Sequence, residues 1–277
     1  MWVNEQQYRK EIIEVGKRLY QKGLLVSTDG NISIRIAENE ILITSSGFCK
    51  GTLTPEQITK VDMAGNIISG LKPARDIRMH LSTYKCRPNV KAIVHAHPPI
   101  TTGFAMTDQT FSKVALPEVL FTMGKIGVTD FALATTEEVP MVVEKTLQQD
   151  PDYGAIILAS HGALTFGNDV WEAFYKMETM EMFLTATLVS KLLGNVNYLS
   201  KVQEGQIWNL IKGGSSTQNS ACSGCGNCAG KNGEKSVQSV QGGQNIKTVQ
   251  KEQGSSGQDM EAVIQKVVEE VIKNLIK

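Results

Sequence analysis

Three of the four histidines stand where a metal ion could use them. His95 and His97 are two positions apart in IVHAH, after apolar residues typical of a buried strand. Because side chains two apart in a strand point to the same face, their imidazoles should lie side by side. His161 ends another apolar run, in ILASHGAL, before a glycine that permits close approach of the backbone. Three imidazoles are a common way to hold Zn²⁺ with one coordination position left open.

The alternative is that these are hydrogen-bonded histidines of the core. A lone histidine is more often of that kind, and neither HxH nor SHG is diagnostic by itself. The two motifs together favour a metal site with one Zn²⁺ per chain. The order of further motifs along the chain must decide between the two interpretations.

Helices and strands in alternation must position these side chains. Apolar residues recurring at helical and strand periods predict a mixed α/β domain over residues 1–212. Pro88 and Gly194 are expected to mark the ends of two helices. We expect strands in 24–36, 39–47, 90–97 and 154–167, and helices in 1–20, 76–87 and 171–193.

The composition excludes several classes of function. Lys plus Arg and Asp plus Glu both total 28, so no net charge draws the chain to nucleic acid. No apolar run is long enough to span a bilayer, and the N-terminal segment lacks the apolar core of a signal peptide. Cys49 and Cys86 stand alone among five cysteines, which does not suggest a disulfide framework. We therefore expect a cytoplasmic protein without nucleic acid or membrane as partner.

The composition changes abruptly after the α/β domain. Residues 213–257 are mostly Gly, Ser, Gln, Asn and Lys, which predicts a flexible linker. Residues 258–277 regain a helical apolar stripe, and Ser256 and Asp259 before it have the spacing of a capping box. An isolated helix of this length is only marginally stable in water, so its apolar face should bind a partner.

Three cysteines gather in the predicted linker, in CSGCGNC. Cys222, Cys225 and Cys228 have a spacing that suits a metal ion or an iron–sulfur cluster, but AGKNGEK supplies no fourth ligand. Either another chain completes a metal or Fe–S site, or these are redox-sensitive or incidental thiols. The second interpretation is our default.

Five motifs follow one another along the chain: GNISIR, ITSSGF, KPARDIRMH, VHAHPP and SHGAL. In this order they resemble the class II aldolase/adducin family, and within it the fuculose-phosphate aldolases. The resemblance covers nearly all of residues 1–212. It implies a three-layer α/β fold with a central, mainly antiparallel sheet flanked by helices, and a homotetramer with active sites at subunit borders. It also implies zinc ligands at His95, His97 and His161, whereas His80 matches no ligand position and is expected to be structural.

The resemblance assigns the acid/base role to Asp76, where these aldolases usually carry Glu. A carboxylate there can move a proton to or from the enediolate carbon that retro-aldol cleavage leaves, while zinc polarises the carbonyl. Asp is one methylene shorter than Glu, and Asp76 could also cap the helix that follows it. Glu118, in ALPEVLF, lies about where the family has a catalytic tyrosine. It either replaces that tyrosine or is a surface residue.

Phosphate binding is implied for two turns and one arginine. Gly30 and Asn31 in the first turn, and Ser46 and Gly47 in the second, match family positions that cradle the phosphate. Glycine permits the backbone geometry that such anion-binding turns require. Taken alone, TSSG is an ordinary turn. Arg75 replaces a family serine and could bind phosphate as a bidentate donor, or could pair with a surface carboxylate.

The function implied is zinc-dependent cleavage of a sugar phosphate, fuculose 1-phosphate or rhamnulose 1-phosphate, to dihydroxyacetone phosphate and lactaldehyde. A pentulose-phosphate 4-epimerase and a methylthioribulose-phosphate dehydratase use the same scaffold. A non-catalytic, adducin-like scaffold is the alternative from another class. That alternative predicts loss of zinc ligands, whereas all three histidines are present here.

The linker and the last helix resemble the encapsulation peptides of bacterial microcompartment enzymes, which bind shell proteins through one apolar face. Such tails occur on aldolases of compartments that degrade fucose and rhamnose. A helix that packs back on its own domain and a coiled coil between subunits are the alternatives. We favour binding to shell proteins because the linker is long and polar.

Overall fold

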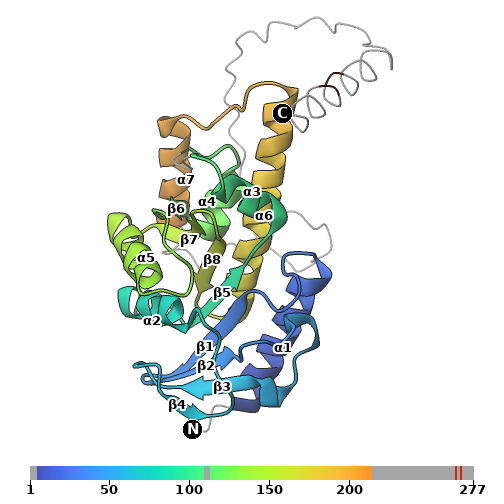
Figure 1. The fold of residues 1–277 in the computed structure, drawn as a ribbon. Coiled ribbons are helices and arrows are strands. Elements are labelled where there is room, and N and C mark those ends of the chain that lie inside the picture. The colour runs from blue at the N-terminus through green and yellow to red at the C-terminus, as the bar shows by residue number, and fades with distance from the viewer. Residues whose placement is uncertain (1–4, 109–112, 214–265, 267–268, 270–277) are drawn as a thin grey trace, which may run out of the picture. The chain divides into compact units, whose positions relative to one another are not determined.

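The computed structural model describes residues 5–108, 113–213, 266 and 269 (Figure 1). The predicted linker and its cysteines lie outside these residues, apart from Gly213, and so does the predicted tail helix apart from Lys266 and Glu269. The boundaries at 212 and 257 therefore stay predictions. No helix among the described residues is long and apolar enough to cross a membrane.

Eight strands form one sheet in the order β4-β3-β2-β1-β5-β8-β7-β6. Every neighbouring pair is antiparallel except β6 and β7, which run parallel. The mainly antiparallel sheet that the motifs implied is thus confirmed. The strands are β1 (Asn31–Ala37), β2 (Glu40–Thr44), β3 (Ile58–Val61), β4 (Ile67–Ser69), β5 (Ala92–Ala96), β6 (Lys125–Val128), β7 (Tyr153–Leu158) and β8 (Gly162–Gly167).

Helices cover both faces of the sheet, with α2 and α5 on one side and α1 and α6 on the other (Figure 1). Buried Ile12, Phe104 and Met177 belong to the α1 side of the core, and buried Met79 and Val143 to the α2 side. The three-layer arrangement is therefore confirmed. The helices are α1 (Glu5–Gln21), α2 (Ile77–Cys86), α3 (Pro99–Ala105), α4 (Pro117–Met123), α5 (Glu138–Gln149), α6 (Val170–Leu193) and α7 (Lys201–Gly213), with short 3₁₀ helices η1 (Lys50–Thr52) and η2 (Pro55–Gln57).

The region 154–167 differs from the single strand expected there. It is a hairpin of β7 and β8 joined by a tight turn, in which Ser160 has a positive φ of 54°. Ser160 N–H donates to Ala105 O over 2.8 Å, and this bond holds the turn against α3. The sequence shows one apolar run because both strands are buried in the middle of the sheet.

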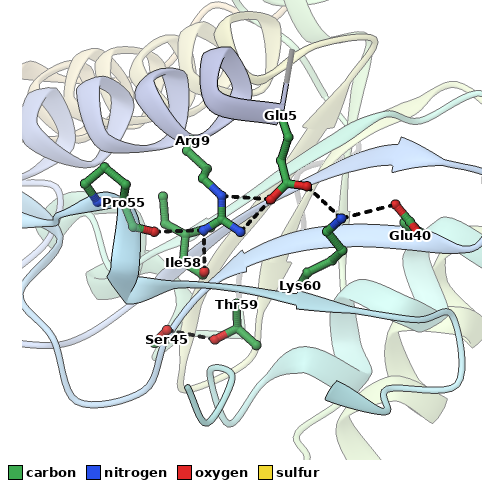
Figure 2. A network of polar contacts seen from close by, with 8 residues as sticks. All are labelled: Glu5, Arg9, Glu40, Ser45, Pro55, Ile58, Thr59 and Lys60. Carbon is green, nitrogen blue, oxygen red and sulfur yellow. Dashed lines mark hydrogen bonds and ion pairs between the residues drawn. The ribbon is translucent and has the colours of Figure 1, made fainter. Parts of the chain in front are cut away.

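The start of α1 is fastened to the β3 side of the sheet by charged side chains (Figure 2). Arg9 Nη1 donates to Pro55 O at 2.8 Å and to Ile58 O at 2.6 Å, and Arg9 also pairs with Glu5. Lys60, which like Ile58 lies in β3, contacts Glu5 at 2.6 Å. This network joins the first turns of α1 to η2 and β3.

Candidate active site

The structure brings the three predicted metal ligands together. His95 lies in β5, His97 directly after it, and His161 in the turn between β7 and β8. One ring nitrogen of each lies within 4.8 Å of the others. The Nε2 atoms of His95 and His97 are 3.2 Å apart. Nitrogens bound at about 2.0–2.1 Å to a tetrahedral Zn²⁺ lie roughly 3.3 Å apart, so this pair has the spacing of two ligands.

The hydrogen-bond partner of His95 determines which nitrogen can bind a cation. His95 is completely buried, and its Nδ1 lies 2.9 Å from Ala163 O. A carbonyl only accepts, so Nδ1 carries the proton and Nε2 presents a lone pair toward His97. Burial lowers the pKa of all three histidines, and the neighbouring imidazoles lower those of His95 and His97 further. The cluster is therefore a set of neutral nitrogen donors, which fits a divalent metal ion of the Zn²⁺ type.

Two glycines allow the backbone to approach this cluster. A Cβ on Gly162 would lie 2.5 Å from His97 Cδ2 and 2.7 Å from Ala96 O. Gly30 has a φ of +66°, and a Cβ there would lie 2.6 Å from His95 O. Glycine is needed at both positions because the strands that carry the histidines leave no space for a side chain.

Asp76 lies beside the histidines at the start of α2. Its Oδ2 is 3.9 Å from His95 Nε2 and accepts a hydrogen bond of 2.8 Å from Asn31 Nδ2. Asp76 occupies the N-cap position of α2, but its side chain makes no capping hydrogen bond. The carboxylate therefore points to the cluster instead of serving the helix.

A row of buried polar groups supports Asn31 from behind. His80 Nε2 lies 2.5 Å from Asn31 Oδ1, and His80 Nδ1 lies 2.7 Å from Ser33 Oγ. Ser33 Oγ in turn contacts the Tyr84 hydroxyl at 2.8 Å. Asn31 and Ser33 are two residues apart in β1, so their side chains point to the same face of the sheet. His80 and Tyr84 are four residues apart in α2 and share one face of that helix, and these two faces contact each other. His80 is not among the clustered metal ligands, and its role is structural, as expected. It supports the candidate site by contacting Asn31.

A cavity of about 210 Å³ opens in front of the cluster. Its walls include every residue assigned to phosphate binding from the sequence, together with the acid and two of the histidines: Gly30, Asn31, Ser46, Gly47, Arg75, Asp76, His97 and His161. Arg75 is exposed, and Gly47 has a φ of +84°. The two turns named from the sequence thus meet on one cavity, because they lie at the same end of the antiparallel pair of β1 and β2.

Glu118 is not among the residues that line this cavity. It is exposed in the first turn of α4, directly after Pro117. Residues 109–112, shortly before it, lie outside the described part of the chain. Within one chain the structure therefore leaves Glu118 apart from the histidines.

Sequence reasoning missed several residues of the cavity wall. Asp29 Oδ2 lies 3.8 Å from His97 Nδ1, and Lys50 and Thr135 also line the cavity. Thr135 has a φ of +67°, an unusual backbone geometry for a β-branched residue. The sequence offered one indication of these residues: Lys50 is the single charged residue in the segment GFCKGTL.

Known proteins of similar sequence cover most of the α/β domain. The L-fuculose phosphate aldolase of Methanococcus maripaludis is 35% identical over 171 residues, which are 62% of this chain and 91% of that protein. The 3-oxo-tetronate 4-phosphate decarboxylase of Haemophilus influenzae is 30% identical over 207 residues, covering 73% of this chain and 96% of that protein.

Solved structures share the fold. The crystal structure of YgbL from Escherichia coli, a candidate aldolase/epimerase/decarboxylase, superposes with a TM-score of 0.68 at 26% identity, covering 75% of this chain and 99% of YgbL. An L-fuculose 1-phosphate aldolase superposes with a TM-score of 0.69 at 24% identity, over 76% of this chain and 96% of the other. Residues 10–188 match the family described as class II aldolase and adducin N-terminal domain, and the chain belongs to that family.

Proposed function

We propose that this chain is a Zn²⁺-dependent lyase that cleaves fuculose 1-phosphate or rhamnulose 1-phosphate to dihydroxyacetone phosphate and lactaldehyde. The observation that carries the proposal is the cluster of three neutral imidazoles, two of which line a cavity together with Asp76. His95, His97 and His161 would hold the metal. A bound divalent cation supplies Lewis-acid polarisation of the substrate carbonyl as the C3–C4 bond breaks.

Asp76 would donate the proton that the enediolate carbon gains. Cleavage leaves an enediolate whose C3 must gain a proton to give dihydroxyacetone phosphate, and a carboxylic acid beside the cluster can deliver it. Asn31 holds the carboxylate in one orientation through its 2.8 Å hydrogen bond. The phosphate group of the substrate would bind in the same cavity, to the turns at Gly30–Asn31 and Ser46–Gly47 and to Arg75.

The hydroxyl on C4 must lose its proton during cleavage, and we assign this step to Glu118. Glu118 does not line the cavity within one chain, so the assignment requires an assembly. A homotetramer with sites at subunit borders would bring Glu118 of a neighbouring copy to the cavity. Mixing inactive Asp76→Asn and Glu118→Gln chains before assembly should then restore part of the activity, because some borders combine two intact residues.

A second candidate substrate is 3-oxo-tetronate 4-phosphate, because relatives named for its decarboxylation cover most of this chain. Loss of CO₂ from C2 of this β-keto acid leaves the same three-carbon enediolate and, after protonation, the same dihydroxyacetone phosphate. The two reactions differ only in the group that leaves. Decarboxylation needs no base for a hydroxyl, so it would not require Glu118.

Product identification with a panel of sugar phosphates tests the proposal. Lactaldehyde from either deoxy-ketose 1-phosphate supports cleavage, and CO₂ from the keto acid supports decarboxylation. An isomeric sugar would identify a pentulose-phosphate 4-epimerase, and a dehydrated ketone a methylthioribulose-phosphate dehydratase. A chelator and His95→Ala should both abolish turnover, and metal analysis should find about one Zn²⁺ per wild-type chain. A metal-free, folded wild-type protein would instead support an adducin-like scaffold.

For the C-terminal segment we propose binding to the shell proteins of a bacterial microcompartment through the apolar face of residues 258–277. The pattern of apolar residues in the sequence supports this proposal. Deleting residues 259–277 should leave turnover unchanged and abolish co-localisation with shell proteins. Entry of the truncated enzyme into the compartment would contradict it.

A cluster or metal at Cys222, Cys225 and Cys228 stays a prediction, tested by iron and zinc analysis of a triple Cys→Ser variant.

A further inference from the structure

Lys50 is a buried cation that the chemistry described above does not use. It begins η1, just after the turn that carries Ser46 and Gly47, and only 2% of it is exposed. Its Nζ donates to Thr28 O at 2.7 Å and to Phe48 O at 2.8 Å. Thr28 lies shortly before the turn of Gly30 and Asn31, and Phe48 directly follows Gly47, so the ammonium links the two segments that carry the turns assigned to phosphate binding.

Among the described residues, the charge of Lys50 has no partner of opposite sign at contact distance. No carboxylate lies within 4.0 Å of its Nζ in the part of the chain that the structure describes. Burial lowers the pKa of Lys50, and Asp29 and Asp76 attract its charge only from a longer range. Burying an ammonium without a counter-charge costs free energy, and an anion bound in the adjoining cavity would offset that cost.

Lys176 shows what this fold does with a buried lysine that has only a structural role. Lys176 is 9% exposed, and its Nζ donates to Phe166 O at 2.9 Å and contacts Glu172 at 2.7 Å. Its charge is therefore neutralised inside the chain. Lys50 has the carbonyl contacts of Lys176 but lacks the carboxylate.

Three residues of the cavity wall, Lys50, Gly30 and Gly47, have N–H hydrogens without an acceptor among the described residues. An ammonium carries three hydrogens, and two of those on Lys50 have acceptors among the described residues. The backbone N–H of Gly30, which is buried, and that of Gly47 have no protein acceptor within the same residues. A cation and backbone N–H groups in the wall of one cavity are the kind of donors that bind a tetrahedral oxyanion.

We propose that Lys50 is the internal counter-charge of the substrate's phosphate group and sets the preference for phosphorylated over free sugars. This inference rests on the proposed function only for the nature of the substrate. The binding of phosphate itself can be measured without any turnover, so the two can fail separately.

Lys50→Met tests the proposal, because it keeps an apolar stem of similar length and removes the charge. Inorganic phosphate and dihydroxyacetone phosphate should bind at least about tenfold more weakly to the variant by calorimetry, the usual order for a charge-assisted hydrogen bond. With substrate, KM should rise by a similar factor, while kcat falls less. Lys176→Met is the matched control and should bind phosphate as the wild type does.

A second measurement covers the case in which Lys50→Met does not fold. In wild-type protein with ¹⁵N-labelled lysine, inorganic phosphate should shift the side-chain signal of Lys50 and leave that of Lys176 in place. A folded Lys50→Met variant that binds phosphate within about twofold of the wild type would overturn the proposal, and so would an unmoved Lys50 signal at saturating phosphate. Loss of phosphate binding in a chain that cleaves no sugar phosphate would support Lys50 and reject the proposed function.

Discussion

The side-chain amide of Asn31 donates a 2.8 Å hydrogen bond to Asp76 Oδ2. This contact determines which group donates and which accepts in the buried hydrogen bonds of His80, Ser33 and Tyr84. Because the amide nitrogen faces the carboxylate, its oxygen faces His80 Nε2, which must then carry the proton. His80 Nδ1 therefore accepts from Ser33, and Ser33 accepts from Tyr84. One tautomer of His80 thus fixes the orientation of the acid.

His80 should influence catalysis through Asp76. His80→Ala leaves the Asn31 amide free to turn, so we expect kcat to fall about 10- to 100-fold, the range seen when a supporting partner of a site residue is removed. His80→Gln can place an N–H near the position of Nε2 and should keep more of the activity. KM for the phosphate-bearing substrate should change little.

A double-mutant cycle separates this role from a loss of stability. In an Asp76→Asn background, His80→Ala should have little further effect on kcat, because the group that it positions is already absent. Equal losses in both backgrounds would show that His80 acts on something other than Asp76.

His80 should also make the protein sensitive to acid. Burial lowers its pKa to about 4, against an ordinary value of 6.5. Between these values the unfolded chain binds a proton that native His80 does not, so the free energy of unfolding falls as the pH drops from 6.5 toward 4. At pH 5 this one group would account for about 2 kcal/mol.

Urea unfolding at pH 7 and at pH 5 measures the effect. His80→Gln should show a smaller loss than the wild type between the two conditions. The other three histidines are present in both proteins, so their contributions cancel in the comparison. Equal losses would mean that His80 titrates alike in the folded and unfolded chains.

The sequence predicted the metal-binding histidines of the site better than the residues that hold the site in place. His95 and His97 could be paired because the period of a strand is two, and the glycine after His161 indicated a tight approach. The partners of His80 could not be inferred, because their contacts depend on how α2 lies across β1. Lys50 was missed for a similar reason, since the absence of a carboxylate near it is a property of the folded chain. Glu118 was placed by family position alone, and nothing in the chain pattern gives its distance from the cavity.

Gly162 should be irreplaceable for a reason of space. In Gly162→Ala the new methyl group would meet the His97 ring and Ala96 O at less than 3 Å. The ring must move, and we expect Zn²⁺ affinity to fall by about 10- to 100-fold, as when the support of a ligand is lost. Gly103→Ala is the control, because nothing lies within 4 Å of a Cβ there. Competition with a fluorescent zinc chelator measures both affinities, and unchanged binding in Gly162→Ala would show that the histidines tolerate the displacement.

Two arginines of α1 offer a matched test of what holds the helix to the sheet. Arg9 and Arg18 each pair with a glutamate four residues earlier, but Arg9 is 11% exposed and Arg18 is 44% exposed. Arg9 also donates to two backbone carbonyls beside β3, as Figure 2 shows. Arg9→Ala removes the charged donor from both carbonyls; Pro55 O keeps the backbone N–H of Ile58, whereas Ile58 O in β3 loses the side chain that bonds it here. The loss should cost about 2–3 kcal/mol of unfolding free energy. Arg18→Ala removes only a surface pair and should cost less than about 0.5 kcal/mol. Similar losses for both variants in urea unfolding would show that the ion pair, and not the bond to the sheet, fastens the helix.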